Sequence, residues 1–93
     1  MITSGQRAKL KALAHPKKPV VLVGKKGITE AVIDEVKIAL LTHELMKVRF
    51  RESEDVKVDA DKVAAQSDAE LVAVLGNVGT FYKAHPERPK IKI

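Results

Sequence analysis

The sequence predicts an α/β domain with the element order α-β-α-β-α-β-β and a mixed four-stranded sheet. The first signal is a pair of strand-like segments, Val20–Val23 and Leu45–Arg51, which flank a stretch with helical spacing of apolar residues, Thr29–His43. Two strands joined through a helix lie parallel, with a right-handed crossover. The second signal is a hairpin formed by Glu70–Gly76 and Thr80–Ala84. The sheet is therefore expected to contain both parallel and antiparallel pairs.

The composition fits one folded domain over residues 1–93. A hydrophobic content of 45% and a charged content of 31% are typical of a globular protein with a modest core. The absence of cysteine excludes disulfides and thiolate metal sites. Charged residues interrupt the start of the chain, and every apolar run is too short to span a bilayer. We therefore expect a cytoplasmic monomer with no membrane partner.

The first helix is expected over Thr3–His15. Thr3 or Ser4 can cap its start, and Pro16 prevents its continuation. Its narrow apolar stripe consists of Leu10, Leu13 and Ala14. This stripe is expected to pack against the rest of the domain.

Basic residues cluster around this helix and the segment that follows it. Arg7 and Lys11 lie four positions apart and share a face, which is interpreted as solvated. Lys17 and Lys18 form a short basic linker into the first strand. The apolar, β-branched run Val20–Val23 predicts a strand that is covered on both faces.

A four-residue turn, Gly24-Lys25-Lys26-Gly27, joins that strand to the second helix. Its glycines allow a tight turn and a close approach to a ligand, and Thr29 can cap the helix. A helix start has unpaired N–H groups and partial positive charge, which suit an anion, and the two lysines add to that charge. The alternative is an ordinary connection whose lysines are only solvated.

The second helix, Thr29–His43, has apolar residues on more than half of its circumference. Ile38 and Leu41 are apolar although they lie outside the helix's main apolar stripe. Such wide apolar coverage predicts that most of the helix surface is packed against the rest of the domain. Acidic residues lie mostly beyond the first turn, so the helix start is positive apart from Glu30. His43 suits the C-terminal end of a helix.

The segment Leu45–Arg51 alternates strictly between two faces. Lys47, Arg49 and Arg51 follow Leu45 on one face, so the exposed side of this strand is a ladder of three cations. Such a row is destabilising unless it is well solvated or meets negative charge. One interpretation is that these cations contact an anion. The other is that this is an edge strand whose charges prevent it from pairing with another chain.

Acidic residues are concentrated in the next segment, which is expected to form a third helix over Asp55–Ser67, capped by Asp55 or Asp59. The stretch Glu52–Glu70 holds seven acidic and two basic residues, whereas the rest of the chain holds fifteen basic and five acidic ones. This separation indicates a polyanionic partner bound on the basic side, with the acidic side facing away from it.

The last part of the chain is expected to contain the hairpin and a tail. The turn between the two strands is placed at Asn77–Gly79. The tail His85–Ile93 contains two prolines and is expected to be extended, with Ile91 and Ile93 docking on the domain.

Residues that could support catalysis do not converge in this sequence. His15, His43 and His85 show no metal-ligand spacing, and the serines lie in no nucleophile motif. The loop between Gly24 and Gly27 lacks the length and terminal residues of a nucleotide-binding P-loop. We therefore expect no catalytic residues, no metal, no cofactor and no small-molecule substrate.

Several stretches together resemble the YhbY/CRM family of RNA-binding domains in its stand-alone bacterial form. The matching stretches are Gln6–His15, Lys18–Val21, Val23–Val32, His43–Arg49, Ala69–Val72 and Pro89–Ile91. The resemblance implies a fold like the C-terminal domain of translation initiation factor three. It also implies RNA binding through the loop residues Gly24, Lys25, Lys26 and Gly27, and association with precursors of the large ribosomal subunit.

The leading hypothesis is a non-enzymatic protein that binds ribosomal RNA during ribosome assembly through the Gly-x-x-Gly loop and a basic face. The expected RNA-contacting residues are Gly24, Lys25, Lys26, Gly27, Thr29, Lys17, Lys18, Lys47, Arg49, Arg51, Tyr82 and Lys83. Few aromatic residues are present, so contacts to the RNA backbone are expected to dominate. The alternative is a protein-interaction module that docks an acidic ribosomal or translation-factor surface.

Overall fold

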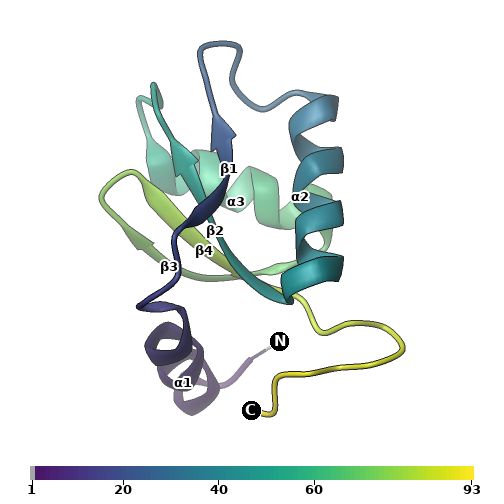
Figure 1. Ribbon diagram of the computed structural model, residues 1–93. Coiled ribbons are helices and arrows are strands. Elements are labelled where there is room, and N and C mark those ends of the chain that lie inside the picture. Colours follow the sequence, from purple (N-terminus) through teal and green to yellow (C-terminus); the bar gives the residue numbers. More distant parts are fainter. Residues whose placement is uncertain (1) are drawn as a thin grey trace.

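Three helices and four strands follow one another in the predicted order in a computed structural model that describes residues 2–93 (Figure 1). The elements are α1 (Ser4–Ala14), β1 (Pro19–Val23), α2 (Glu30–His43), β2 (Leu45–Phe50), α3 (Val56–Ser67), β3 (Glu70–Leu75) and β4 (Val78–Tyr82). The predicted α/β class and element order are confirmed. Within residues 2–93 no helix is long and apolar enough to cross a membrane.

The four strands form one mixed sheet with the order β1-β2-β4-β3. β1 and β2 pair in parallel, while β4 pairs antiparallel with both β2 and β3. The predicted crossover and hairpin are therefore both present. β2 lies between β1 and β4 and is not an edge strand. The interpretation that its cations protect an edge strand from pairing is therefore wrong.

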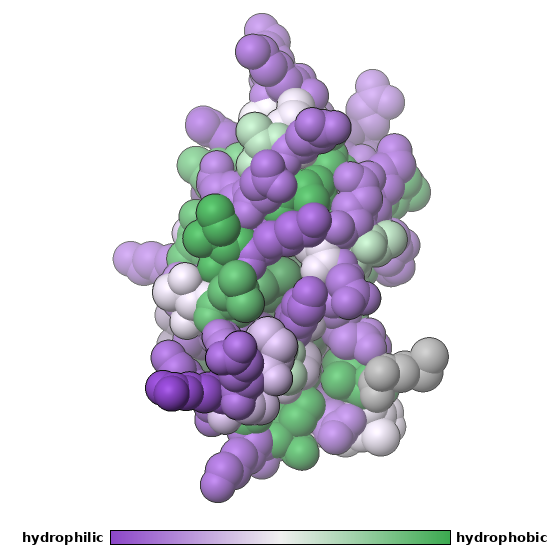
Figure 2. Space-filling model, turned by 90° about the vertical axis from the view of Figure 1, so that its right-hand side faces the viewer, coloured by the Kyte–Doolittle hydropathy of each residue, from purple (hydrophilic) through white to green (hydrophobic). Residues whose placement is uncertain are grey.

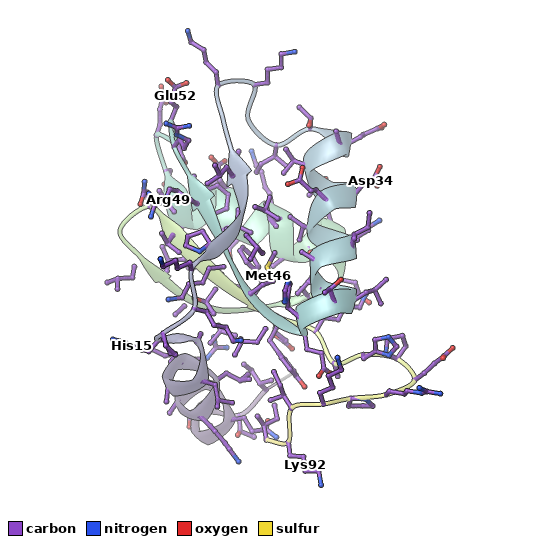
Figure 3. All side chains as sticks on the ribbon, in the orientation of Figure 1. His15, Asp34, Met46, Arg49, Glu52 and Lys92 are labelled. Atoms are coloured by element: carbon purple, nitrogen blue, oxygen red, sulfur yellow. The ribbon has the colours of Figure 1, made fainter. Side chains whose placement is uncertain are left out.

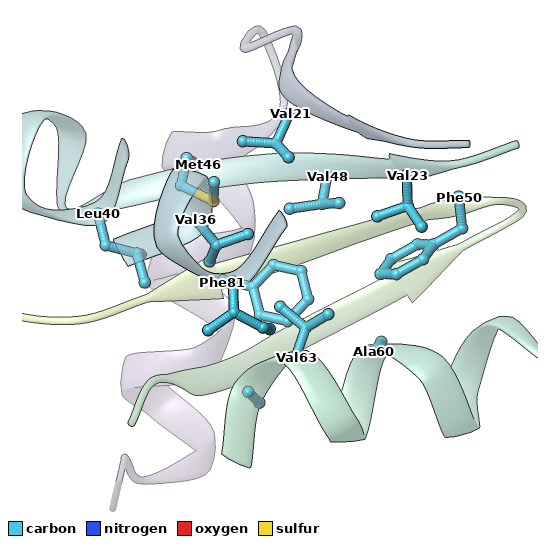
Figure 4. Close-up of a cluster of buried hydrophobic side chains, with 12 residues drawn as sticks. Val21, Val23, Val36, Leu40, Met46, Val48, Phe50, Ala60, Val63 and Phe81 are labelled. Carbon is cyan, nitrogen blue, oxygen red and sulfur yellow. The ribbon is translucent and has the colours of Figure 1, made fainter. Parts of the chain in front are cut away.

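The main core lies between the sheet and the helix pair α2 and α3, which cover one face (Figures 1 and 4). β2 contributes Met46, Val48 and Phe50 to this core, and β4 contributes Phe81, each at most 1% exposed. These side chains alternate with polar or smaller ones along each strand, as the pleat requires. Their burial fixes the register that aims the Lys47 side of β2 at the opposite face.

The opposite face of the sheet is covered only in part, by α1 (Figure 1). Leu10 and Ala14 of α1 pack there on Leu45, Val72 and Tyr82. All three lie toward the end of the sheet where β2 begins and β4 finishes. The tail residues Ile91 and Ile93 pack against the same cluster, as predicted, whereas Leu13 is exposed.

Two predictions of extensive burial are wrong. Val20 and Leu22 are 48% and 54% exposed, because β1 is an edge strand and α1 does not reach over it. Ile38 and Leu41 of α2 are 66% and 52% exposed, because the helix contacts the sheet and α3 along one side only. The face on which α2 lies accordingly shows hydrophobic side chains between hydrophilic ones (Figure 2).

The hairpin turn lies earlier than predicted. β3 ends at Leu75, and the turn consists of Gly76, at a φ of +59°, and Asn77. Gly79 belongs to β4, where an added Cβ would lie 3.0 Å from the Phe81 ring. Gly79 is thus a packing residue against an aromatic ring, and sequence alone does not separate this role from that of a turn glycine.

Each helix begins at a side-chain cap. Thr3 accepts a hydrogen bond from the Gln6 N–H, and the Gln6 side chain accepts one from the Thr3 N–H. Thr29 caps α2 and Asp55 caps α3. These caps fix the points at which the preceding loops enter the helices.

Candidate nucleic-acid interface

The loop Gly24–Gly27 connects the end of β1 to the start of α2 and projects beyond the sheet (Figure 1). The Gly27 N–H donates to the Gly24 carbonyl at 3.0 Å, which closes a tight turn. Gly27 has a φ of +72°, a conformation that side chains with a Cβ rarely adopt. The predicted tight turn is present, and its second glycine is required by the backbone.

The two glycines of the loop differ in what they contribute to folding. A Cβ on Gly24 would meet no heavy atom within 4 Å, and its φ is not positive. Gly27→Ala should lower the free energy of unfolding by about 1–2 kcal/mol, whereas Gly24→Ala should leave it unchanged within about 0.5 kcal/mol. Urea unfolding of both variants measures this difference. Equal losses would contradict the distinction.

Lys25 and Lys26 are both exposed on this loop. Nitrogen-tipped side chains extend outward from it in Figure 3. Within residues 2–93 neither lysine makes a hydrogen bond or an ion pair. Their charges are therefore available to an external anion.

The start of α2 adds backbone donors beside these lysines. The Thr29 side chain accepts from the Val32 N–H at 3.2 Å, which occupies one of the first-turn donors. The N–H groups nearest the start of the helix have no partner within it and face the loop side. Glu30 lies in the first turn and reduces the positive potential there.

The cations of β2 lie on the face of the sheet that α2 and α3 leave free. Arg49 is exposed and points away from α2, whereas Met46 points into the core (Figure 3). Lys47 is half-buried, and its Nζ lies 3.5 Å from the carbonyl oxygen of His15. The predicted alternation is present, with Leu45 as the buried first member of the cationic face.

Arg51 continues this row to the glycine loop. Its backbone N–H donates to the Val23 carbonyl at 3.0 Å, and a shallow hollow there is lined by Gly24, Lys25, Arg51 and Glu52. Glu52 is exposed at this point, so one acidic residue stands among the cations (Figure 3). It opposes the binding of an anion at the hollow.

Lys17 and Lys18 join the same face from the start of β1. They line one groove together with Lys47 and Arg49. The fold thus brings together most of the cations expected to contact RNA, although they come from the linker before β1, the loop after it and β2.

Two of the expected contact residues lie elsewhere. Tyr82 is 7% exposed within the α1 cluster, and burial, together with the Glu44 carboxylate, raises the pKa of its phenol. Its burial contradicts a stacking contact with a base. Lys83 lies at the opposite end of the sheet from the loop, where its Nζ is 3.4 Å from the Ser67 carbonyl and 3.8 Å from an Asp68 carboxylate oxygen.

A buried acidic residue, Glu44, organises that opposite end. It caps α2 at a φ of +61° and is 1% exposed. Its Oε1 accepts from the N–H groups of Lys90 at 2.6 Å and Ile91 at 3.1 Å, and its Oε2 accepts from the His85 N–H at 2.8 Å. The carboxylate thereby ties the tail to the domain.

The ionisation of Glu44 follows from these contacts. Burial alone raises the pKa of a carboxyl group, but the N–H donors of His85, Lys90 and Ile91, with the nearby His85 ring, lower the pKa of Glu44 below its ordinary value. The carboxylate is therefore charged at neutral pH. Sequence inspection missed this role, although an acidic residue at a helix C-terminus, against the helix dipole, is a usable signal.

Arg7 is a second residue whose role was missed. Its guanidinium Nη1 donates to the backbone carbonyls of Leu71 at 2.5 Å and Val72 at 2.8 Å, at the irregularity in the pairing of β3 with β4. The predicted solvated face of α1 is therefore wrong at this position. Arg7 anchors α1 to an edge strand by donating to two of its backbone carbonyls.

The acidic residues of helix α3 are separated from the cations by the sheet, whereas Glu52 lies beside the glycine loop. α3 packs against α2 and the sheet on the covered face, and its Asp61 pairs with Lys57 at 2.8 Å. Asp59 accepts from the Ser53 hydroxyl at 2.6 Å. Across residues 2–93 no group of three or more His, Cys, Asp or Glu side chains is arranged to hold a metal ion.

Comparisons with known proteins agree with this geometry. A family model described as the CRS1 / YhbY (CRM) domain matches residues 2–83. A protein of Pseudomonas aeruginosa named a probable RNA-binding protein is 35% identical over 91 residues, covering 96% of this chain and 88% of its own. One from Haemophilus influenzae named an RNA-binding protein is 33% identical over 90 residues, covering 92% and 89%.

A solved structure shares the whole fold. The solution structure of a hypothetical protein from Staphylococcus aureus superposes with a TM-score of 0.86 at 32% identity. The match covers 100% of this chain and 99% of that one. The architecture described above is therefore that of a known, experimentally solved fold.

Proposed function

This chain belongs to the CRS1/YhbY (CRM) domain family, and on that premise we propose that it is a non-enzymatic RNA-binding protein. Its target is ribosomal RNA within a precursor of the large ribosomal subunit, and it acts in ribosome assembly. The RNA lies across the Gly24–Gly27 loop and the basic face beside it. Membership of the family and the names of its relatives support RNA as the ligand.

The observation that carries the proposal is the set of unpaired cations on one side of the sheet. Lys25 and Lys26 have no partner within residues 2–93, and Arg49 and Arg51 are likewise exposed without an ion pair. Like charges held together in this way are compensated when they bind a polyanion. Phosphate groups match both the lysine side chains and the N–H donors at the start of α2.

Each part of the face has a distinct role in this proposal. Lys25 and Lys26 contact phosphates, and Gly24 leaves room for the sugar-phosphate backbone to approach the loop. Gly27 keeps the turn in shape, and Thr29 caps the helix whose first N–H groups face the phosphate. The cations of β2 extend the contact along the sheet.

Crosslinking in bacterial cells that express the chain, followed by sequencing of the attached RNA, tests the proposal. We expect enrichment of large-subunit ribosomal RNA, with reads that extend into precursor sequence. Loss of crosslinks in a Lys25→Ala/Lys26→Ala variant would tie the RNA to the loop. Failure to retain ribosomal RNA, with nuclease-resistant association with an acidic protein instead, would overturn it in favour of a protein-docking module.

A further inference from the structure

We infer that the open half of the sheet is a groove for single-stranded RNA, in which unpaired bases rest on an aliphatic floor and phosphates face a cationic rim. The inference rests on the RNA-binding function proposed above and goes beyond it by naming the class of RNA. It concerns the surface between the end of α1 and the Gly24–Gly27 loop.

The groove exists because α1 covers only part of its face of the sheet (Figure 1). The helix packs on Leu45, Val72 and Tyr82, which leaves the other end of β2, β3 and β4 without a cover. A groove of about 480 Å³ remains between Lys11, Ala14 and His15 of the α1 end and the three strands. This volume falls within the range of sites that bind small molecules or single nucleotides.

The floor of the groove is aliphatic. β3 contributes Ala73 and Leu75, and β4 contributes Val78. Leu75 is 84% exposed. Leu22, 54% exposed, does not line the groove, but it lies beside it on the same face, because it is in register with Arg49. The two leucines stand at opposite edges of one row across the sheet, with Arg49 and Val78 between them, and exposed apolar side chains rimmed by polar residues indicate a binding surface.

The rim of the groove selects a polyanion. Its charged members all carry positive charge: Lys11, Lys17, Lys18, Lys47 and Arg49. No acidic residue among those described lines the groove, and the acidic helix α3 lies behind the sheet. An apolar floor inside a cationic rim matches a strand that exposes bases on one side and phosphates on the other.

The pairing state of the RNA follows from the same features. A duplex presents phosphates and sugars at its surface and keeps its base faces stacked inside, so it would leave the floor unused. A single strand can place its bases on the floor while its backbone runs along β1. Leu22 lies beside the groove, in register with Arg49, and is two positions before Gly24, so the same face continues from the groove to the Gly24–Gly27 loop.

Binding of two RNAs with equal numbers of phosphates tests the inference: an unstructured oligoribonucleotide and a blunt hairpin, measured by fluorescence anisotropy. The informative variant is Leu22→Thr/Leu75→Thr, which keeps the charge of the protein and the strand propensity. We expect about a fivefold loss of affinity for the single strand, less than about a twofold loss for the hairpin, and an unchanged salt dependence.

The chain offers a matched control on the other side of the molecule. Ile38 and Leu41 are exposed to a similar degree on α2, so Ile38→Gln/Leu41→Gln removes comparable apolar surface away from the groove and should change neither affinity. Unchanged circular dichroism and melting of both variants would show that each is folded.

The remaining outcomes separate the inference from the function on which it rests. Tight binding of the hairpin, with no effect of the floor variant on either RNA, would overturn the groove and leave the RNA-binding function standing. Absence of binding to both RNAs would overturn the function itself. Displacement of the single strand by polyglutamate of equal charge would make an acidic protein segment the occupant and would also overturn the groove.

Discussion

Replacing Glu44 by Gln is expected to lower the free energy of unfolding by about 2–3 kcal/mol. This loss is large for the substitution of a single acidic residue. The carboxylate accepts three backbone N–H groups of the tail and is 1% exposed. A glutamine can present only one oxygen, so its NH₂ group would face an N–H donor. One buried donor loses its partner, and the charge assistance of the others is lost.

Thermal and urea unfolding measure this loss. A melting temperature lower by about 10 °C or more is expected for a domain of this size. Glu87→Gln is the matched control, because Glu87 is an exposed acid in the same tail and its side chain makes no hydrogen bond or ion pair within residues 2–93. It should change stability by less than about 0.5 kcal/mol. Similar losses in the two variants would show that the Glu44 contacts are not stabilising.

The pH dependence of stability provides a second readout of the same contacts. Because the pKa of Glu44 is lower in the folded protein than in the unfolded chain, its contribution is complete above the unfolded value of about 4.3 and is lost as pH falls through the lower, folded value. The difference between the native protein and Glu44→Gln should therefore shrink in acid. A difference that is constant with pH would contradict a stabilising charge at this position.

Glu44 also shows where reasoning from sequence ends. Its backbone has a φ of +61°, a region in which glycine or asparagine is expected at the end of a helix. Glutamate occupies it because the side chain must reach the tail, whose Lys90 lies 46 positions later in the chain. Local propensity describes neighbours in sequence, so it does not predict a contact between a helix end and a distant, extended tail.

The elements themselves were predictable because their signals are local. Apolar periodicity identified α2 and the alternating strand β2, and cap residues identified the helix starts. Which faces of each element are buried by other elements was less predictable. The apolar run of β1 resembles a fully buried strand, but its position at the sheet edge leaves Val20 and Leu22 exposed, and only the three-dimensional arrangement of α1 determines that.

The charged residues of the candidate interface could be predicted from the sequence. The apolar residues that form the floor of its groove could not. Clusters of lysine in the linker and loop are visible in the sequence, as is the ladder of β2. Leu75 and Val78, in contrast, belong to a hairpin far from those cations in the chain. They join the cationic face because β4 inserts between β2 and β3, a strand order that periodicity does not reveal.

Removing both loop lysines is expected to weaken RNA binding about tenfold and to flatten its salt dependence. Each phosphate contact releases condensed counterions, so the slope of log K against log salt should become less steep by about 1.4–1.8 in the Lys25→Ala/Lys26→Ala variant. Both side chains are exposed, so folding should be unaffected. Affinity titrations over a series of salt concentrations measure the slope directly.

A second pair of lysines distinguishes a specific contact from a change in net charge. Lys57→Ala/Lys62→Ala removes the same charge from α3, behind the sheet, and should leave the slope unchanged. Glu52→Gln should act in the opposite direction to the loop variant, because it removes the negative charge beside Gly24 and Lys25. If the α3 pair weakens binding as much as the loop pair, total charge governs affinity and the loop is not the contact. Opposite effects of Lys25/Lys26 and Glu52, with no effect of α3, would show that the local charge at the Gly24–Gly27 loop, and not the total charge, governs RNA affinity, as expected for phosphate held there.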